Sequence, residues 1–383
     1  MVIVIADDIT GGAEIAGIAH RYGLRTVMTI DRMPQDYDEG KEYDVVVIAT
    51  DARSYRADVA AEITAEAVRS VCRKVTDLAN GSHLFRKTDS ALRGNVKEEL
   101  DAIIHNSPYD YVRYMPANPS KGRIIADGVY YIRDDKKAGR TGTPISETSF
   151  RYDPEFPALS SSMEERFPGL PYANATTKEE VDNVVREALE NEKRVLLAGA
   201  ADLFCSMIER IYGFAPQQPR EFEGLPEKCA MLVVCGSTLS RAIDLGLAVE
   251  TMPYDVFYEE KEPKEWTENI AARYLREAER IEQPRHGTVM TIGDKPVRKG
   301  HEAAVFLRNA MAEVCCGLIR KATPDEMVIE GGATAFAILK RMPWHTFYVT
   351  DEVAPGVVRM AAEGGKMCVT LKPGSYEWGE LWK

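Results

Sequence analysis

Two carboxylates, a hydroxyl and two glycines follow the first apolar run of the chain. Residues 2–6 are apolar and β-branched, which is typical of a buried strand, and apolar residues return at helical spacing from Ile15. The residues between the two runs include Asp7, Asp8, Thr10, Gly11 and Gly12. In open α/β sheets ligands bind at this end of a strand, where the next helix offers N–H groups to an anion. Asp and Thr also cap helices, so this junction alone does not distinguish a ligand site from a plain helix start.

A second junction of the same design adds positive charge. It has the sequence Lys87-Thr-Asp-Ser-Ala-Leu-Arg-Gly-Asn95 and follows a strand-like run at 83–87. Lys87 and Arg93 are suited to neutralise a carboxylate or a phosphate. Asp89 and Ser90 can bind hydroxyl groups, and Asp89 is also suited to act as a base. A capped helix start explains the same residues, but two cations around Asp-Ser favour a functional site.

A third polar junction follows the strand-like run at 111–115. It contains Asn118, Lys121 and Arg123 within a segment that also holds two prolines. Alone, this segment is a proline-stiffened turn. Beside the other two junctions, it predicts a third wall of a polar pocket that accepts anions.

The second half of the chain carries glycine and hydroxyl residues after strand-like runs. Such residues let backbone N–H groups approach a phosphate closely. They occur at 235–240, 330–335 and 372–375, and each occurrence alone is weak because glycine is common at strand ends. Three in one domain favour nucleotide binding, and the candidate residues are Ser237, Thr238, Gly331, Gly332, Ala333, Thr334 and Gly374.

Several familiar sites are absent from the sequence. It contains no GxxxxGK[ST] or GxGxxG phosphate-binding motif and no HExxH or GxSxG motif. The six histidines are scattered, and the seven cysteines form no CxxC pair. The sequence therefore does not predict a histidine-built metal site, and it predicts reduced, mostly buried thiols in the cytoplasm.

Composition excludes some classes of partner. The chain has 383 residues, 45% of them hydrophobic and 28% charged, and a net charge of −12. An acidic surface argues against nucleic acid and anionic membranes as partners, so any anionic ligand needs a local group of cations. No apolar run reaches membrane-spanning length, and the first residues do not resemble a signal peptide. The sequence leaves open whether the chain forms a homo-oligomer.

The elements expected to position these residues alternate between strands and helices. In the first half, strands are expected at 2–6, 45–50, 83–87, 111–115 and 194–198, and helices at 57–78, from 96, and at 177–191. Asp127-Gly128 predicts a hairpin within 123–133, and 134–176 is expected to be a long loop that faces the substrate.

The second half repeats this alternation after a proline-rich linker at 213–228. Strands are expected at 230–235, 256–258, 289–292, 327–329, 346–350 and 368–371, and helices from 241 and at 264–281, 302–321 and 334–341. The predicted fold is two α/β domains, 1–218 and 219–383, with largely parallel sheets and a ligand cleft between them.

The motifs resemble those of the four-carbon acid sugar kinase family. Ala6-Asp-Asp-Ile-Thr-Gly11 is similar to that family's Ala-Asp-Asp-Leu-Thr-Gly, and Lys87-Thr-Asp-Ser-Ala-Leu-Arg-Gly94 to its Lys-x-Asp-Ser-Thr-Leu-Arg-Gly. Further similarities follow in the same order over nearly the whole chain, at 116–119, 122–123, 147–148, 153–154, 236–237, 331–332 and 372–374.

The resemblance implies an N-terminal domain that binds an acid sugar and a C-terminal domain that binds ATP. The implied reaction is Mg²⁺- and ATP-dependent phosphorylation of a terminal hydroxyl of threonate, erythronate or a 3-oxo-tetronate. Asp8 and Asp89 are then the catalytic candidates, with Asp8 preferred as the base. Lys87 and Arg93 would hold the substrate carboxylate. The remaining expected substrate-binding residues are Asp7, Thr10, Gly12, Ser90, Asn118 and Arg123.

The chain departs from the family pattern at three places. The first motif continues Gly12-Ala-Glu14 where the family usually has Ala-Asn-Asp. The family's Gly-Gly-Glu/Asp-Thr-Ser is Gly331-Gly-Ala-Thr-Ala335 here, which removes a carboxylate near the expected phosphates. The final Lys-Ser/Pro-Gly-x-Phe-Gly is Lys372-Pro-Gly-Ser-Tyr-Glu377. A non-catalytic sensor of a sugar acid or a nucleotide is therefore the alternative function.

Overall fold

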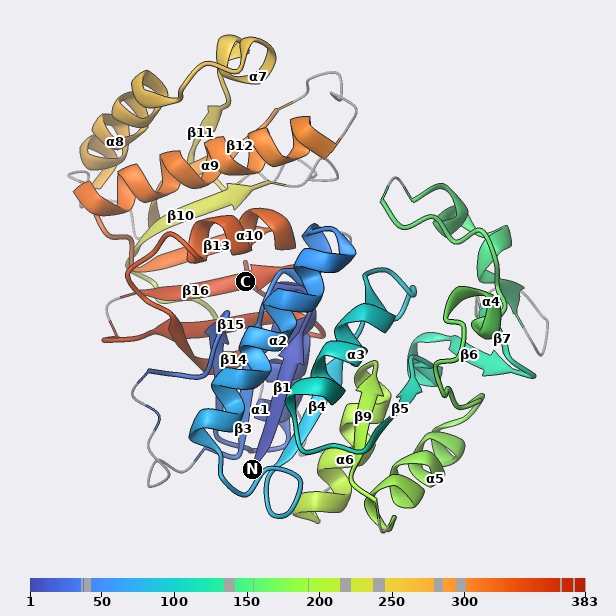
Figure 1. Ribbon diagram of the computed structural model, residues 1–383. Coiled ribbons are helices and arrows are strands. Elements are labelled where there is room, and N and C mark those ends of the chain that lie inside the picture. The colour runs from blue at the N-terminus through green and yellow to red at the C-terminus, as the bar shows by residue number, and fades with distance from the viewer. Residues whose placement is uncertain are drawn as a thin grey trace. The chain divides into compact units, whose positions relative to one another are not determined.

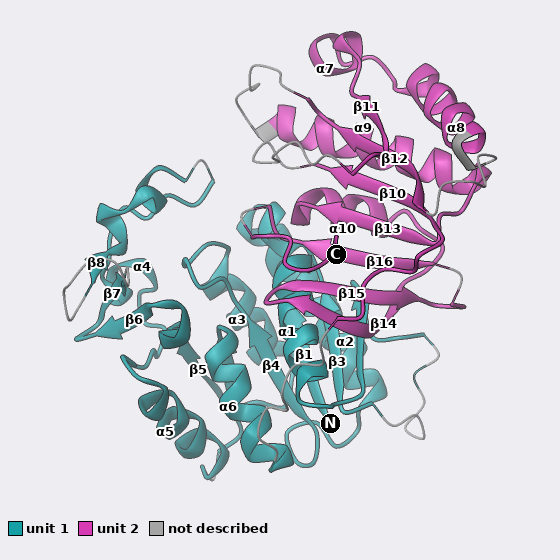
Figure 2. Cartoon of the chain, turned by 180° about the vertical axis from the view of Figure 1, so that it is seen from behind, with its two compact units in different colours: residues 1–217 teal, residues 218–383 magenta. Residues whose placement is uncertain are grey.

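The structure is a computed structural model. The chain forms two compact units, residues 1–217 and residues 218–383 (Figure 2). The described residues are 1–35, 37, 43–133, 142–153, 155–191, 193–213, 222–236, 245–278, 285–293, 301–365, 367–374 and 376–382. Half of the expected linker, residues 214–221, and with it the expected boundary at 218 lie outside them. Among them, no helix combines the length and apolar character needed to cross a bilayer.

A parallel sheet forms the centre of the first unit (Figure 1). Its strand order is β2-β3-β1-β4-β9-β5. The bounds are β1 Val2–Ala6, β2 Thr26–Ile30, β3 Val45–Ala49, β4 His83–Lys87, β5 Tyr111–Met115 and β9 Val195–Gly199. Every residue of β1, β2 and β3 is buried, as expected for parallel strands that are covered on both faces.

Helices cover both faces of this sheet. The bounds are α1 Ile9–Arg21, α2 Ala57–Lys74, α3 Val96–Asn106, α5 Lys178–Leu189 and α6 Ala201–Tyr212. The chain moves toward one edge of the sheet after β1 and toward the other after β3, so right-handed crossovers place α1 and α2 on opposite faces. In agreement, α1 contacts α6 while α2 packs against α3.

The register of the strands places their carboxyl ends side by side. Ala6 at the end of β1 pairs with Ala49 of β3 and with Lys87 of β4. Gly199 of β9 pairs with Lys87 and with Met115 of β5. The loops after β1, β3, β4 and β5 therefore leave the sheet at one edge, which is where ligands bind in such folds.

A small antiparallel sheet lies within the first unit. It consists of β6 Arg123–Ala126, β7 Val129–Ile132 and β8 Thr143–Pro144. Asp127 and Gly128 both have positive φ, as a tight hairpin turn requires, so the predicted hairpin is confirmed. The described part of 134–176 is not simply a loop, because it contains β8, two short 3₁₀ segments at Ile145–Glu147 and Ser149–Tyr152, and α4 Met163–Arg166.

The second unit contains a sheet of order β11-β12-β10-β13-β16-β15-β14. Its strands are β10 Cys229–Cys235, β11 Ala248–Thr251, β12 Arg285–Thr291, β13 Glu326–Glu330, β14 Thr346–Ala354, β15 Val357–Ala362 and β16 Cys368–Lys372. The strands from β11 to β16 in this order are parallel, and β15 and β14 are antiparallel to their neighbours. The helices are α7 Tyr254–Glu259, α8 Lys264–Ala278, α9 His301–Lys321 and α10 Gly332–Leu339.

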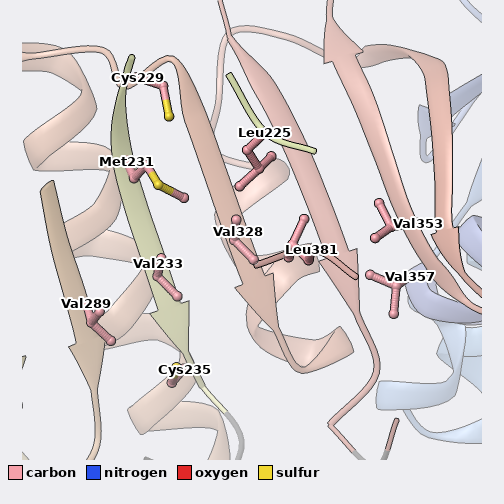
Figure 3. Close-up of a cluster of buried hydrophobic side chains, with 10 residues drawn as sticks. All are labelled: Leu225, Cys229, Met231, Val233, Cys235, Val289, Val328, Val353, Val357 and Leu381. Carbon is pink, nitrogen blue, oxygen red and sulfur yellow. The ribbon is translucent and has the colours of Figure 1, made fainter. Parts of the chain in front are cut away.

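An apolar cluster covers one face of this second sheet (Figure 3). Alternate residues of β10 contribute Cys229, Met231, Val233 and Cys235, because successive strand side chains point to opposite faces. Leu381 near the C-terminus is fully buried in the same cluster. The segment that contains Leu381 therefore packs on this face of the sheet, in the place that a helix usually occupies in α/β folds.

The predicted fold class, α/β with two domains and largely parallel sheets, is confirmed. One predicted strand is wrong, since 256–258 lies in α7, where Pro253 begins a helix. The sequence analysis also missed β2, β11, β15 and α6. The helix expected to start at 241 falls outside the described residues.

Candidate functional site

Charged side chains from the loops after β1, β3, β4 and β5 meet at the carboxyl edge of the first sheet. We call them the strand-end cluster. Its members are Asp7, Asp8, Glu14, Arg53, Lys87, Asp89, Arg93 and Lys121.

Arg53 lies at the centre of the acidic side of this cluster. Its Nε and Nη2 donate to the two Asp7 carboxylate oxygens at 2.9 and 2.7 Å, and Nη2 also donates to Asp8 Oδ1 at 3.1 Å. Its Nη1 lies 3.8 Å from Asp89 Oδ1. Burial opposes the charge of Arg53, but these three carboxylates outweigh burial and raise its pKa. Asp7 is buried and faces Arg53 with both oxygens, so its role in the structure is to orient Arg53.

Asp8 both caps helix α1 and contributes a carboxylate to the cluster. Its Oδ1 accepts from the Gly11 N–H at 3.1 Å, and its Oδ2 accepts from the Thr10 hydroxyl. A Cβ at position 11 would lie 2.5 Å from Asp8 Oδ1, so glycine there leaves room for this cap. Burial alone would raise the pKa of Asp8, but Arg53 and Lys87 outweigh it and the pKa is lowered. Asp8 is therefore ionised at neutral pH.

Glu14, on α1, lies between two lysines. Lys87 Nζ is 3.4 Å from Glu14 Oε2, and Lys121 Nζ donates to Glu14 Oε1. Lys87 also donates to the Thr88 carbonyl at 3.1 Å. Burial would raise the pKa of Glu14, yet the two lysines outweigh burial and lower it. The positive charge of Lys87 is thus already balanced by an internal carboxylate.

Asp89 and Arg93 form a two-pronged ion pair. Arg93 Nε and Nη2 donate to Asp89 at 2.8 and 3.0 Å, and the Ala91 and Arg93 backbone N–H groups donate to the same carboxylate. Burial opposes ionisation of Asp89, but Arg53 and Arg93 outweigh it and hold its pKa well below the usual range. Both predicted catalytic carboxylates, Asp8 and Asp89, are therefore ionised at neutral pH.

Asn118 and Arg123 lie at the turn that follows β5. Asn118 Oδ1 accepts from the Asp202 N–H at 3.2 Å, so this side chain holds the turn to the start of α6. The Arg123 guanidinium lies over the Phe150 ring, 5.2 Å from its centroid. Its Nε and Nη1 are buried without a hydrogen-bond partner. A buried donor without an acceptor costs about 1–3 kcal/mol, so this arrangement is unusual in a folded protein.

The remaining predicted residues of this region have separate places. The Ser90 carbonyl accepts from the Tyr130 hydroxyl, which ties the loop after β4 to the hairpin. Gly12 faces the sheet instead of the cluster, because a Cβ there would meet Val47 Cγ1 at 3.3 Å. Its N–H donates to the Asp8 carbonyl within the helix. The structure therefore corrects the expected place of Gly12, which is a helix–sheet packing position.

In the second unit, the predicted glycine turns follow three adjacent strands. Cys235 of β10 pairs with Glu330 of β13, which in turn pairs with Lys372 of β16. The following turns and the start of α10 contain Gly236, Gly331, Gly332, Ala333, Thr334 and Gly374, whereas Ser237 and Thr238 lie outside the described residues.

Two contacts define the backbone at these turns. Gly331 has φ +103°, which favours glycine, and its N–H donates to the Lys372 carbonyl at 2.9 Å. A Cβ at Gly236 would lie 2.2 Å from Thr334 Oγ1, so the end of β10 approaches the first turn of α10 closely. The end of β10 therefore lies beside the first turn of α10, whose backbone N–H groups resemble those of phosphate-binding helix starts in other α/β proteins.

A buried lysine holds the last of these turns. Lys372 Nζ donates to Glu330 Oε1 at 2.6 Å and to the Pro373 carbonyl at 3.1 Å, and it lies 4.6 Å from the centroid of the Trp378 ring. Both charged side chains are almost fully buried. The pair therefore joins β13 to β16 and fixes the turn that contains Gly374.

Comparison with protein-family models matches both units. Residues 2–202 match a sugar-binding N-terminal domain, and residues 248–376 match a nucleotide-binding C-terminal domain. The chain belongs to the four-carbon acid sugar kinase family. The resemblance seen in the motifs is thereby confirmed.

Two named kinases align with most of the chain, and a third aligns with less than half of it. It is 25% identical to D-threonate kinase of Salmonella typhimurium, over 92% of this chain and 89% of that protein. It is 23% identical to 3-oxo-tetronate kinase of Pseudomonas fluorescens, over 97% and 93% of the two chains. The alignment with D-erythronate kinase of Heliobacterium modesticaldum reaches 33% identity but spans 41% of this chain and 33% of that protein.

Two crystal structures share the fold of this chain. Haemophilus influenzae protein HI1011 superposes with a TM-score of 0.68 at 18% identity, over 99% of this chain and 98% of that one. A Salmonella typhimurium LT2 protein superposes with a TM-score of 0.73, also at 18% identity, over 100% and 97% of the two chains. At this identity the similarity concerns the fold alone.

The sequence analysis of this kinase-family chain missed Glu14 and Arg53 as members of the cluster, whereas Lys121 was expected in the wall of the pocket. Arg53 follows the end of β3, so the rule that placed Asp8 and Lys87 also applies to it. Glu14 lies one helical turn after Thr10, on the same face of α1. Their pairing partners depend on strand order, which the sequence alone does not give. Among the described residues, no group of three or more His, Cys, Asp or Glu side chains is placed to hold a metal ion.

Proposed function

We propose that this protein is a kinase that transfers a phosphoryl group from ATP to the terminal hydroxyl of a four-carbon sugar acid. The relatives that align with most of the chain are D-threonate and 3-oxo-tetronate kinases, which supports this substrate class. The observation that carries the proposal is the strand-end cluster, in which ionised Asp8 lies among cations at the ligand-binding edge of the sugar-binding domain.

Asp8 is the proposed general base. A base must accept the proton of the attacking hydroxyl, and Asp8 is ionised at neutral pH. Arg53 donates to the same carboxylate and fixes its orientation. Asp89 remains the second candidate, but its pairing with Arg93 and two backbone N–H groups suits it better to positioning Arg93.

The proposed sugar acid contacts come from both sides of the cluster. Thr10 and Ser90 would bind hydroxyl groups, while Lys87, Arg93, Asn118 and Arg123 would form the anion-binding side. An acidic protein needs such a local concentration of cations to bind an anionic substrate. Asp7 would act through Arg53, whose guanidinium it holds.

The glycine turns of the second unit are the proposed ATP site, with Gly331, Gly332, Ala333, Thr334 and Gly374 and, from the sequence, Ser237 and Thr238. The backbone N–H groups of Gly332, Ala333 and Thr334 are suited to phosphate oxygens, because they lie in the first turn of α10, where an N–H has no partner within the helix. The Gly331 N–H instead donates to the Lys372 carbonyl. Mg²⁺ would accompany the nucleotide, since this ion takes most of its ligands from phosphates and water and neutralises charge on the transferred group.

A non-catalytic sensor of a sugar acid or a nucleotide is the second candidate. Ala333 favours it, because this position lacks the carboxylate that the kinase pattern has there. For either function we propose that the protein is cytoplasmic, since all seven cysteines are free thiols.

ADP release distinguishes the two candidates. The full chain is incubated with Mg-ATP and, separately, D-threonate, D-erythronate and a 3-oxo-tetronate, and ADP is measured against a control without acid. A kinase releases ADP with at least one acid. Binding of an acid or nucleotide by calorimetry without acid-dependent ADP release would establish the sensor instead.

A further inference from the structure

Arg123 differs from the cations of the strand-end cluster in its pairing. Arg53, Lys87 and Arg93 each face an internal carboxylate, from Asp7, Glu14 and Asp89 respectively. The Arg123 guanidinium has two buried nitrogen atoms, Nε and Nη1, that lack a hydrogen-bond partner. Of these two donors, Nη1 belongs to the end of the guanidinium, where a carboxylate oxygen can accept from it, whereas the Nε–H points to the other side.

The fold holds Arg123 next to the cluster. Backbone hydrogen bonds join Asn118 and Arg123 in both directions, at 2.7 and 3.0 Å, so the first residue of β6 is fixed where the chain leaves β5. Lys121, within the same turn, reaches Glu14 on α1.

The aromatic neighbour of Arg123 leads to the cluster from a second direction. Phe150 lies against the guanidinium, and Asp153 in the same segment lies 3.9 Å from Arg93 Nη1. Arg123 is therefore connected to the strand-end cluster in two ways, through Lys121 in its own turn and through the segment that contains Phe150 and Asp153. Stacking on Phe150 restricts the plane of the guanidinium without using any of its N–H groups.

We propose that Arg123, supported by Phe150, binds the substrate carboxylate and selects sugar acids over uncharged sugars. This inference rests on the proposed function, and it narrows the anion-binding side to one residue. The internal carboxylates already balance Lys87 and Arg93, so those cations chiefly hold Glu14 and Asp89 in place. The buried Nη1 of Arg123 gains a charge-assisted hydrogen bond when a carboxylate binds, and an uncharged sugar offers a weaker acceptor.

The test compares Arg123→Gln and Arg123→Lys with a matched control, Arg151→Gln. Arg151 is an exposed arginine in the segment next to Phe150. In Arg123→Gln we expect the KM for the preferred acid to rise on the order of 10- to 100-fold, as for loss of a charge-assisted hydrogen bond. The KM for ATP and the Tm should stay unchanged. Arg123→Lys should recover part of the affinity, because it restores the charge without the guanidinium, and Arg151→Gln should match the wild type.

Two results would overturn the inference while the kinase function stands. One is an active Arg123→Gln enzyme whose KM for the acid changes by less than about threefold, well below the expected loss. The other is a parallel rise in the KM for ATP or a fall in Tm, which would indicate a structural role.

Failure of the proposed function is recognised separately, by a wild type that releases no ADP with any acid. Calorimetric titration of the same acids into wild type and Arg123→Gln then decides the question for Arg123. Loss of acid binding in the variant supports the inference. Retained binding, or a wild type that binds no acid, overturns it.

Discussion

Asp8 combines a structural task with a proposed chemical task in one side chain. Its carboxylate accepts from the Gly11 N–H at the start of α1 and faces Arg53 in the strand-end cluster. Asn caps a helix as well as Asp does, but the Asn side chain carries no charge and cannot act as a general base. The two tasks can therefore be separated by a single substitution.

We predict that Asp8→Asn abolishes most turnover and leaves the fold intact. Loss of a general base typically lowers kcat by about 10²–10⁴-fold. The retained cap should keep helix α1 formed, so circular dichroism of the variant should match the wild type. Acid-dependent ADP release measures the loss, and near-normal turnover in a folded variant would remove Asp8 from the role of base.

Lowered pKa values in the cluster predict how stability depends on pH. The pKa values of Asp8, Glu14 and Asp89 all fall below their unfolded values of 3.8, 4.5 and 3.8. Their contribution to stability is fully present above the unfolded values and is lost as pH falls through the folded ones. We therefore expect Tm to decline below about pH 4.5, in addition to any general acid effect.

Asp89→Asn provides the control for this pH dependence. The variant lacks one of the three carboxylates, so it should be less stable than the wild type at pH 7. The difference in Tm between the two proteins should narrow as the pH falls below about 3.8, because Asp89 then takes up a proton in the unfolded wild type while it stays ionised in the folded protein. A difference that stays constant across this range would contradict the prediction.

The residues of the site were partly predictable from the sequence. Position after a strand identified Asp8, Lys87 and Arg93, because parallel strands bring such positions to one edge. The same rule did not show that Arg93 pairs with Asp89, or that Glu14 neutralises Lys87. Those pairings depend on the direction in which each side chain leaves its turn, and a shift of one residue along the chain would point it to the opposite side.

At the level of elements, a buried ion pair joins β4 to two helices. Arg86 on β4 pairs with Glu99 on α3, and Glu99 also accepts from the Thr64 hydroxyl of α2 at 2.9 Å. Arg86 Nη1 donates to the Ile5 carbonyl of β1 at 2.9 Å. Both charged side chains are 1% exposed, and this buried network fixes α2 and α3 against the central strands.

We predict that breaking this pair from one side costs more than replacing both partners. Glu99→Leu leaves the Arg86 charge buried without its carboxylate and should destabilise the protein by about 3–5 kcal/mol. The double variant Arg86→Met with Glu99→Leu should recover part of that loss. Denaturant unfolding measures both variants, and a double variant less stable than Glu99→Leu would show that the charge of Arg86 is satisfied elsewhere.

Elements with strong local patterns were predicted well. The sequence placed β4 and β5 correctly because apolar runs end there in polar junctions, and α5 begins at the Thr177–Glu180 capping box. It missed β2 and β15, although neither strand is shorter than β4 or β5, because their pairing with neighbouring strands is not visible in the sequence. The apolar residues at 256–258 were assigned to a strand because three residues do not distinguish a strand from a helical turn.

For the whole molecule, the division into two units predicts separate ligand responses. The family models assign sugar binding to residues 2–202 and nucleotide binding to 248–376. Each ligand should therefore slow hydrogen exchange mainly in its own unit. An acid should protect the loops after β1, β4 and β5, and a non-hydrolysable ATP analogue should protect residues 331–334.

Hydrogen exchange with mass spectrometry on the full chain measures this difference. Each ligand is used at about 100 times its Kd, where it stabilises the folded state by about 2.7 kcal/mol. Mannitol, which carries no carboxylate, serves as the control for the acid. Protection of 331–334 by the acid alone, or of the β1 loop by the nucleotide alone, would reverse the assignment of the two sites.

The contact between Lys372 and Trp378 has a practical consequence. An ammonium group 4.6 Å from an indole ring shifts its excited-state energy, so the emission of this tryptophan reports on the position of the neighbouring charge. The same lysine is hydrogen-bonded to the carbonyl before Gly374. The chain thus carries a native fluorophore beside one of its proposed phosphate-binding turns, and rapid-mixing fluorimetry can follow events there in real time without an attached dye.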